Sequence, residues 1–275
     1  MRDLSENTSL LSLNTATVGD QWTLEECIEG CLRHGIGGIA PWRDKLLECG
    51  VGKASKLIKD SGLRVSSLCR GGFFTSDKNG NLDDNFRAVD EAAAITAESL
   101  VLVVGGLLPD SKDIDQARER VETSIQKLLE YARSAGVVLA IEPLHPMYAA
   151  DRACVNTLGQ AIDVCERVGE GIGIIVDVYH VWWDPNLKFE ISRAGSKNLI
   201  LGYHVCDWLV PTDDLLLDRG MMGDGIIDLK TIRASVEAAG YDGPIEVEIF
   251  SKKNWWQRDP DEILKVCVER FQSVT

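Results

Sequence analysis

Residues 157–180 read TLGQAIDVCERVGEGIGIIVDVYH, and this stretch contains one complete structural repeat. Thr157 and Gln160 fit a capping box, in which two side chains satisfy unpaired backbone donors at the start of a helix. An amphipathic segment follows, and Gly169 can adopt the left-handed conformation with which helices commonly end. The apolar run Ile172–Tyr179 does not alternate with polar residues, which is typical of a parallel strand buried on both faces. The stretch therefore predicts a helix followed by a buried parallel strand.

The same unit recurs along the whole chain. Its eight apolar runs are Leu10–Val18, Gly37–Trp42, Arg64–Cys69, Ser99–Gly105, Val137–Leu144, Ile172–Tyr179, Leu199–Cys206 and Pro244–Phe250. Amphipathic segments separate them, and the glycines that precede the next run are Gly35, Gly62, Gly136, Gly169, Gly195 and Gly240. Two further helix starts are marked by Thr23 with Glu26 and by Asp259 with Pro260 and Glu262.

Eight strand–helix units in 275 residues average about 34 residues each, and eight is the number that closes a barrel. We predict the α/β class and a single (β/α)8 TIM barrel, forming one domain over residues 1–275. A doubly wound open sheet is the alternative fold, although no GxGxxG-type turn follows the first predicted strand.

The composition restricts the partners and the location of the protein. The chain has 29 Lys and Arg against 43 Asp and Glu, so its net charge of −14 argues against nucleic acid as a partner. No apolar run approaches the roughly 18 residues of a membrane span, and the first twenty residues lack the apolar segment of a secretory signal. The eight Cys include no CxxC pair, which indicates reduced thiols. We expect a cytoplasmic protein with no membrane partner.

Ionisable residues end four consecutive predicted strands, inside otherwise apolar runs. The four ends are IEPLH at 141–145, VDVYH at 176–180, YHVCD at 203–207 and IEVEIF at 245–250. Three of the four His in the chain lie there, and a carboxylate in such a position is costly unless it is paired or bound to a metal. Active sites of (β/α)8 barrels lie at the C-terminal ends of the strands. We therefore predict the active site at these four ends.

Four of these residues offer three oxygen donors and one imidazole: Glu142, Asp177, His204 and Glu248. This set suits Mn²⁺, with Mg²⁺ or Co²⁺ as alternatives, better than a thiolate-rich zinc site. Glu246 and Glu248 point to the same side of their strand, and Glu246 lies roughly 7 Å deeper at about 3.3 Å per residue. The spacing alone leaves open which of the two is the ligand. Cys206, on the same side of its strand as His204, is interpreted as a small buried apolar residue.

These strand ends resemble those of the xylose-isomerase-like barrel superfamily of sugar isomerases, sugar 3-epimerases and related enzymes. The alternation of strands and helices resembles that superfamily over the whole chain. The specific resemblance lies in IEPLH, VDVYH, YHVCD with the later Arg219, and GYDGPIEVEIF at 240–250. It implies that Glu142, Asp177, His204 and Glu248 bind the metal, because the GPIxxE spacing selects Glu248. It also implies that the two glutamates are acid/base residues on opposite faces of the sugar, and that His180 and Arg219 contact the substrate.

His145 departs from the epimerase pattern and looks more like a motif of bacterial C-glycoside deglycosidases in the same superfamily. Those enzymes use a divalent metal and a His base to eliminate an aglycone from a 3-oxo-glucoside, and they carry a second, small β-rich subunit. Two functions therefore stay open: a metal-dependent isomerase or epimerase that removes a proton next to a carbonyl of a sugar or keto-sugar, and a lyase of the deglycosidase type. We expect a catalytic or substrate-binding role for His145.

Aromatic and basic residues surround the predicted site. All seven Trp fall near predicted strand-to-helix loops, and Trp183 and Trp208 are expected to cover the apolar face of a sugar or an aromatic aglycone. Basic residues near the predicted strand ends offer two interpretations, a site for an anionic group or solubilising surface charge, and the second is preferred: Arg70, Arg219, Lys252 and Lys253. No clear phosphate loop indicates a sugar phosphate. The expected partners are a small-molecule sugar or glycoside and further copies of the chain in a homo-oligomer, or the small subunit in a deglycosidase.

Two other functions are weighed against these. An apurinic-site endonuclease of the same superfamily needs a basic face and more His than the four present. A barrel that binds a sugar or a protein without catalysis is the alternative from a different class, and the four intact ligand positions count against it.

Overall fold

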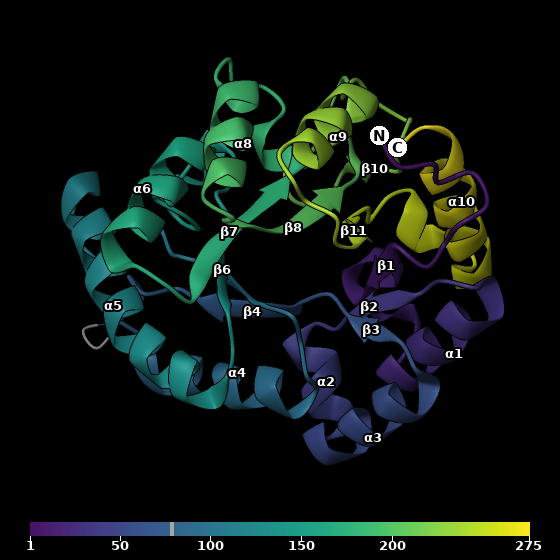
Figure 1. Cartoon of the computed structure of the whole chain (residues 1–275), viewed down its shortest axis with the longest axis horizontal. Coiled ribbons are helices and arrows are strands. Elements are labelled where there is room, and N and C mark those ends of the chain that lie inside the picture. The colour runs from purple at the N-terminus through teal and green to yellow at the C-terminus, as the bar shows by residue number, and fades with distance from the viewer. Residues whose placement is uncertain (78–79) are drawn as a thin grey trace.

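The computed structural model describes residues 1–77 and 80–275. Within them the main sheet has nine strands in the order β3-β2-β1-β11-β8-β7-β6-β5-β4, and each ladder is parallel. The strands are β1 (Leu11–Asn14), β2 (Gly38–Ala40), β3 (Arg64–Val65), β4 (Leu68–Gly72), β5 (Leu100–Val103), β6 (Leu139–Ile141), β7 (Ile172–Asp177), β8 (Ile200–Val205) and β11 (Ile245–Val247). They form a nearly closed ring with helices outside it (Figure 1).

The two ends of the sheet are parts of one barrel strand. β3 pairs with β2 and β4 pairs with β5, and only Ser66 and Ser67 separate the two segments. An isolated parallel bridge between Trp42 and Cys69 continues the contact beyond β2. The eight predicted strand positions are therefore confirmed, the barrel is confirmed, and the open-sheet alternative is wrong.

The helices follow the strands in the expected order. They are α1 (Leu24–His34), α2 (Arg43–Cys49), α3 (Val51–Ser61), α4 (Leu82–Ala94), α5 (Ile114–Ala135), α6 (Leu158–Val168), α7 (Val178–Val181), α8 (Leu187–Ser196), α9 (Leu229–Ala238) and α10 (Pro260–Ser273). Short 3-10 helices are η1 (Thr15–Gln21), η2 (Pro146–Tyr148) and η3 (Trp255–Gln257), and a small antiparallel pair joins β9 (Asp207–Trp208) to β10 (Arg219–Gly220). Among the helices described, none has the length and apolar character that crossing a membrane requires.

Most of the predicted helix boundaries are confirmed, and one is wrong. Thr23 and Glu26 form the complete capping box of α1, and α1 ends at Gly35 in the left-handed conformation (φ 68°). Gly195 does not end a helix, because α8 continues through it. A Cβ at that position would lie 2.2 Å from the backbone oxygen of Ala239. Gly195 therefore lets α8 pack closely against the end of α9.

The two termini lie side by side (Figure 1). Arg233 on α9 holds them together, because its guanidinium donates to the backbone oxygens of Arg2 and Thr275, each at 2.6 Å.

Two of the strands end earlier than the apolar pattern predicts, and their last residues begin a helix. The Asn14 side chain accepts a hydrogen bond from Ala16 N and caps η1. The Asp177 carboxylate accepts from Tyr179 N and caps α7. Apolar residues continue beyond both positions, so composition alone gave no sign of the helix start.

Alternation along the strands decides which side chains enter the barrel. Cys69, Val101, Ala140 and Ile175 form a small buried cluster of their own, separate from the core under the helices. Because successive side chains point to opposite faces of a strand, Glu142 shares the face of Ala140 and Asp177 shares the face of Ile175. The fold therefore turns both carboxylates toward the barrel axis.

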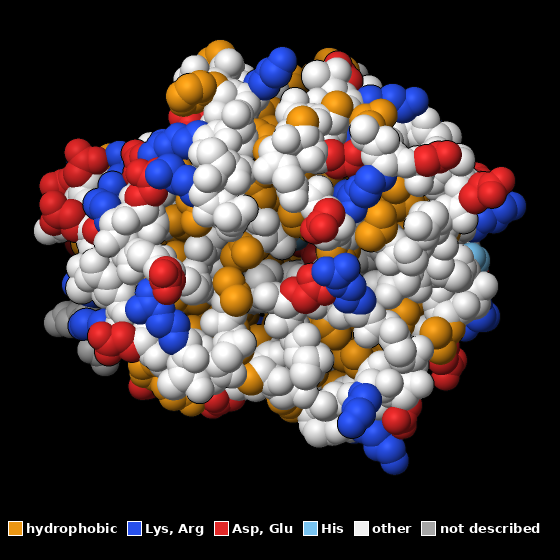
Figure 2. Space-filling view, viewed as in Figure 1, with side chains coloured by type: hydrophobic (Ala, Val, Ile, Leu, Met, Phe, Trp, Pro, Cys, Tyr) orange, Lys and Arg blue, Asp and Glu red, His pale blue; other side chains and the backbone are white. Residues whose placement is uncertain are grey.

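The face drawn in Figure 2 carries acidic and basic side chains intermixed. No extended basic patch lies on that face, in keeping with the net charge of −14.

Candidate metal centre and active site

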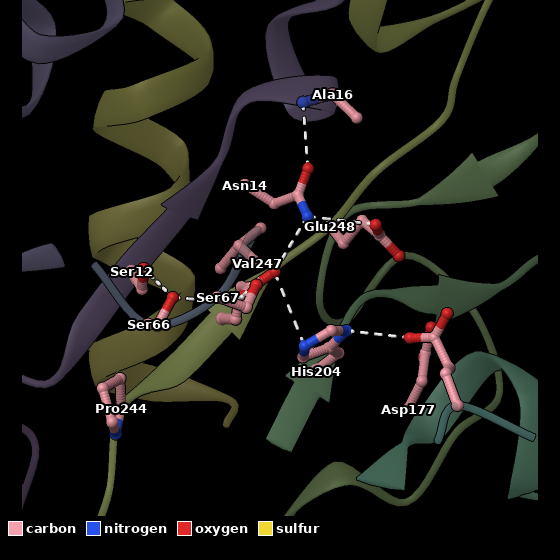
Figure 3. A network of polar contacts seen from close by, with 12 residues as sticks. Ser12, Asn14, Ala16, Ser66, Ser67, Asp177, His204, Pro244, Val247 and Glu248 are labelled. Atoms are coloured by element: carbon pink, nitrogen blue, oxygen red, sulfur yellow. Dashed lines mark hydrogen bonds and ion pairs between the residues drawn. The ribbon is translucent and has the colours of Figure 1, made fainter. Parts of the chain in front are cut away.

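Four side chains from four adjacent barrel strands converge at one point. Glu142 follows β6, Asp177 ends β7, His204 lies in β8, and Glu248 follows β11. All four are buried, and one potential ligand atom from each lies within 4.8 Å of every other. Figure 3 labels three of them, Asp177, His204 and Glu248. We call these residues the four-residue cluster. The structure thus brings together the four metal ligands expected from the sequence.

The internal contacts of the cluster fit a divalent cation. His204 Nδ1 and Glu142 Oε1 lie 3.1 Å apart, yet within the described chain neither atom has a hydrogen-bond partner of acceptable geometry. Burial raises the pKa of Asp177 and of Glu248, although the nearby Arg219 opposes the shift. Two orphaned ligand atoms among crowded, desolvated carboxylates favour a bound positive charge. The donor set, three carboxylates and one imidazole, is one that hard or borderline divalent cations accept.

Glu246 lies behind His204 and outside the cluster. Its Oε1 is 3.5 Å from His204 Nε2, the ring nitrogen that faces away from Glu142. Burial lowers the pKa of His204, but Glu246 and Glu142 outweigh burial and raise that pKa to about 10. A carboxylate on the far nitrogen of a ligating His fixes the orientation of the ring. The geometry therefore groups Glu248 with the candidate ligands and leaves Glu246 outside them, in contact with the ring of His204.

A network of hydroxyl and amide groups holds Glu246 in turn. Asn14 Nδ2 donates to its Oε1 at 2.8 Å, and the Ser66 and Ser67 hydroxyls donate to its Oε2 at 2.8 and 3.0 Å (Figure 3). Asn14 Nδ2 also lies 3.0 Å from Glu248 Oε1, so one amide joins both glutamates. The break between β3 and β4 is thus the point at which two serines reach the barrel interior.

We expect Glu246→Gln to weaken Mn²⁺ binding by about 10- to 100-fold, the usual effect of losing a carboxylate behind a ligating His. The amide keeps the volume but removes the negative charge next to His204 Nε2. Isothermal titration of the purified variant with Mn²⁺ measures the change. Glu269→Gln, on the exposed side of α10, is the matched control, and unchanged affinity in Glu246→Gln would contradict the positioning role.

Arg219 and His180 complete the inner wall. Arg219 Nη1 lies 3.1 Å from Glu248 Oε2 and 3.3 Å from Asp177 Oδ2, and its Nη2 lies 3.2 Å from His180 Nε2. Burial lowers the pKa of His180, and Arg219 lowers it further, so the ring is neutral at physiological pH. Asp177 and Glu248 therefore share the buried guanidinium group of Arg219, and the neutral imidazole of His180 lies beside it.

A small cavity of about 30 Å³ opens above the cluster. Its lining comprises Trp42, Cys69, Arg70, Val103, Glu142, Leu144, Tyr148, Arg152, His180, Leu216, Arg219, Glu248 and Phe250. Besides Glu142 of the cluster, four of these residues have a buried polar atom without a hydrogen-bond partner in the described structure: Trp42 Nε1, Arg70 Nε, Tyr148 Oη and Arg219 Nε. Each such atom costs about 1–3 kcal/mol. Their concentration around one cavity indicates a ligand that is rich in oxygen.

Residues 28–267 match the family model described as xylose isomerase-like TIM barrel. The chain belongs to this family. It is 57% identical to protein SMc04130 from Sinorhizobium meliloti 1021, whose crystal structure superposes with a TM-score of 0.95 over 98% of this chain and 99% of that one. It is also similar in fold to the IolI protein, solved with a binding zinc atom, at 21% identity and a TM-score of 0.82 over 96% of this chain and 97% of that one.

One curated relative carries an activity in its name. The inosose isomerase of Halalkalibacterium halodurans is 31% identical over 152 residues, which are 52% of this chain and 50% of that protein. The match thus spans only about half the length of the relative.

Three other residues that the sequence predicts to be in the site lie together but do not line the cavity: His145, Trp183 and Trp208. The His145 ring packs 5.0 Å from that of Trp208 and 5.7 Å from that of Trp183. His145 Nδ1 accepts from Met147 N at 3.2 Å and caps η2, and Trp183 Nε1 donates to the backbone oxygen of His180. The backbone N–H of His145 donates to His180 Nδ1 at 3.1 Å. In this structure the three side chains support the loop behind His180, and their roles in substrate binding or catalysis stay predictions.

Sequence reasoning missed two residues that line the cavity. Tyr148 and Arg152 belong to η2 and the segment after it, which follow Glu142 and return along the barrel through backbone hydrogen bonds to Gly105 and Leu107. The sequence of this loop has no periodic pattern, so the positions of Tyr148 and Arg152 at the cavity could not be predicted from it. The sequence also offers Arg70 as a basic residue near the site, but its preferred interpretation there is surface charge.

Proposed function

We propose that the chain is a single-domain, divalent-metal-dependent carbohydrate enzyme that removes a proton from the carbon next to a carbonyl of a sugar or keto-sugar. The proton returns to give an isomer or an epimer. The observation that carries the proposal is the placement of Glu142 and Glu248. Both line one cavity and both belong to the four-residue cluster, yet β7 and β8 separate their strands. Two carboxylates therefore approach one bound substrate from different sides.

The residues divide the chemistry between them. A divalent cation held by the cluster supplies Lewis-acid polarisation of the carbonyl, which makes the neighbouring C–H acidic. Glu142 or Glu248 accepts the proton, since both carboxylates line the cavity. Delivery of a proton to the opposite face gives an epimer, and delivery to the adjacent carbon gives an isomer. Arg219 and neutral His180 line the same cavity and orient the oxygens of the substrate.

Mn²⁺ is the cation that we propose, with Mg²⁺ and Co²⁺ as alternatives. The donor set of three carboxylates and one imidazole supports a hard or borderline ion. The zinc atom in the IolI structure supports a divalent cation in this fold without identifying the ion for this chain.

Two further observations support a sugar or a polyol-derived ketone as substrate. The four orphaned polar atoms around the cavity match a molecule that offers several hydroxyl or carbonyl oxygens. The partial similarity to an inosose isomerase points to the same class of compound.

Hydrogen exchange tests the proposal. The protein with Mn²⁺ is incubated in D₂O with free ketoses, inososes and a 3-oxo-glucoside, and the products are followed by NMR. We expect deuterium at the carbon next to the carbonyl, together with a new epimer or isomer. No exchange into any of these compounds would contradict the proposal.

An eliminating lyase of the C-glycoside deglycosidase type is the second candidate. The backbone contact of His145 with His180 favours it, because His180 lines the cavity and the contact holds a possible base next to the cavity wall. Release of free aglycone from the 3-oxo-glucoside, without epimer or isomer, would establish this activity and would lead to a search for a small β-rich subunit.

The two candidates predict different effects for His145→Ala. For the isomerase or epimerase we expect turnover to fall less than about tenfold, because the His145 ring packs on Trp208 outside the cavity lining. Loss of a catalytic base costs about 10²–10⁴-fold. Turnover measured at saturating substrate makes the comparison. A loss above about 100-fold with the fold intact would favour the lyase.

A further inference from the structure

Two arginines of the cavity form no side-chain hydrogen bond or ion pair in the described structure. The other arginines of the chain each form a hydrogen bond or an ion pair with a carboxylate or a carbonyl oxygen. Arg70 and Arg152 form neither with their side chains in the described structure, although the chain has 43 acidic residues. Both line the cavity above the four-residue cluster. Unpaired guanidinium groups are therefore confined to the place where a substrate would bind.

Aromatic rings hold both guanidinium groups in place. The guanidinium of Arg70 lies 4.1 Å from the ring centre of Phe73 and 5.8 Å from that of Trp42, and its Nε is buried without a partner. The guanidinium of Arg152 lies 5.7 Å from the ring centre of Tyr148, whose buried hydroxyl also lacks a partner. A guanidinium packed on a ring keeps its N–H edge available for oxygen acceptors.

The surrounding charge favours an anion at this place. Burial lowers the pKa of Arg70, and the positive charges of Arg152 and Arg43 lower it further. Arg43 forms ion pairs with Asp84 and Glu91, whereas neither Arg70 nor Arg152 forms an ion pair with a carboxylate in the described chain; Asp84 acts on Arg70 only beyond contact distance. Two cations held near each other in a partly buried cavity repel, and an anionic ligand between them removes the repulsion.

We propose that the substrate carries an anionic oxygen group, a carboxylate or a phosphate, that binds to Arg70 and Arg152 and accepts a hydrogen bond from Tyr148. The substrate is then an acidic sugar derivative, with its carbonyl end at the four-residue cluster and its anionic end at these arginines. The inference rests on the proposed function, because the cluster must receive the reacting end of the same molecule. For Arg70 it favours anion binding over the surface charge that the sequence suggested, and it adds Arg152 and Tyr148 to the same site.

Binding measurements test this inference with three probes of similar size: gluconate, glucose 6-phosphate and glucose. Isothermal titration is carried out with the Mn²⁺-loaded protein at low and at moderate salt. We expect one of the two acidic probes to bind at least tenfold more tightly than glucose, with an advantage that decreases as salt rises. Preference for gluconate identifies a carboxylate site, and preference for glucose 6-phosphate identifies a phosphate site. Equal binding of all three probes would overturn the inference.

Variants locate the site. Arg70→Gln and Arg152→Gln should each remove about tenfold or more of the affinity for the preferred acidic probe and change the affinity for glucose by a smaller factor. Arg167→Gln, which alters an exposed arginine on α6, is the matched control. Unchanged affinity in both cavity variants, with the fold verified by circular dichroism, would overturn the inference.

The exchange assay in D₂O separates this inference from the proposed function. Exchange into neutral ketoses, with no preference for acidic sugars in binding or turnover, leaves the proposed function standing and overturns the anionic site. Arginine-dependent binding of an acidic sugar, with no exchange into any acidic or neutral carbonyl compound, supports the anionic site and overturns the proposed function.

Discussion

Replacing Glu142 or Glu248 with Gln should abolish turnover and leave the fold intact. The carboxamide neither accepts a proton nor ligates a cation as a carboxylate does, so the loss should reach at least the 10²–10⁴-fold typical of a missing acid/base group. Without added cation the variants should stay folded, because each change removes one negative charge from a buried cluster whose ligand atoms lie within 4.8 Å of one another. Turnover by NMR and thermal unfolding by circular dichroism measure the two effects.

The control for both variants is Glu269→Gln, the same chemical change on the exposed surface of α10. It should retain full turnover. If Glu142→Gln and Glu248→Gln both kept activity, the assignment of the active site to the four-residue cluster would be wrong. If only one of them kept activity, a single base would act and epimerisation by two opposed carboxylates would be excluded.

Removal of divalent cations should abolish activity and lower the melting temperature. A ligand that binds only the native state at 100 times its dissociation constant stabilises it by about 2.7 kcal/mol. For a chain of this size that corresponds to about 5–10 °C. The buried carboxylates of the cluster are the physical cause, because without a cation only Arg219 and His204 offset their charge. Melting curves after treatment with a chelator, and again after addition of Mn²⁺, measure the shift.

Asp177→Asn is the variant that makes this measurement specific. It replaces a negatively charged ligand with a neutral amide and should reduce the rise in melting temperature that Mn²⁺ causes. Asp163→Asn, on the exposed side of α6, should preserve that rise. A melting temperature that neither the chelator nor Mn²⁺ changes would contradict a cation site in the cluster.

The barrel and the position of the cluster follow from local regularities. The repeat of capping residue, amphipathic helix, glycine and buried strand is encoded within about 34 residues, so each unit is readable on its own. Alternation within a strand then determines that Glu142 points inward with Ala140 and that Glu248 points inward with Glu246. Because the strands are parallel, their C-terminal ends meet at one rim, and the four ionisable ends had to come together.

The roles that depend on contacts between distant segments were not predictable. Glu246 is held by Ser66 and Ser67, about 180 residues away, and this contact exists only because the third barrel strand is interrupted between β3 and β4. The course of the loop after Glu142 determines that Tyr148 and Arg152 line the cavity, and no periodic pattern encodes a loop. The two tryptophans expected at the substrate pack on His145 for the same reason.

The location of a bound cation decides whether the four-residue cluster is a metal site. Crystals grown with Mn²⁺ give anomalous difference density that identifies the ion independently of any activity. We expect one strong Mn²⁺ peak about 2.0–2.5 Å from an atom of each of the four cluster residues, Glu142, Asp177, His204 and Glu248. We expect none on Glu246. A peak held by other residues, or no peak at Mn²⁺ concentrations that support turnover, would contradict the assignment of the metal site to the cluster.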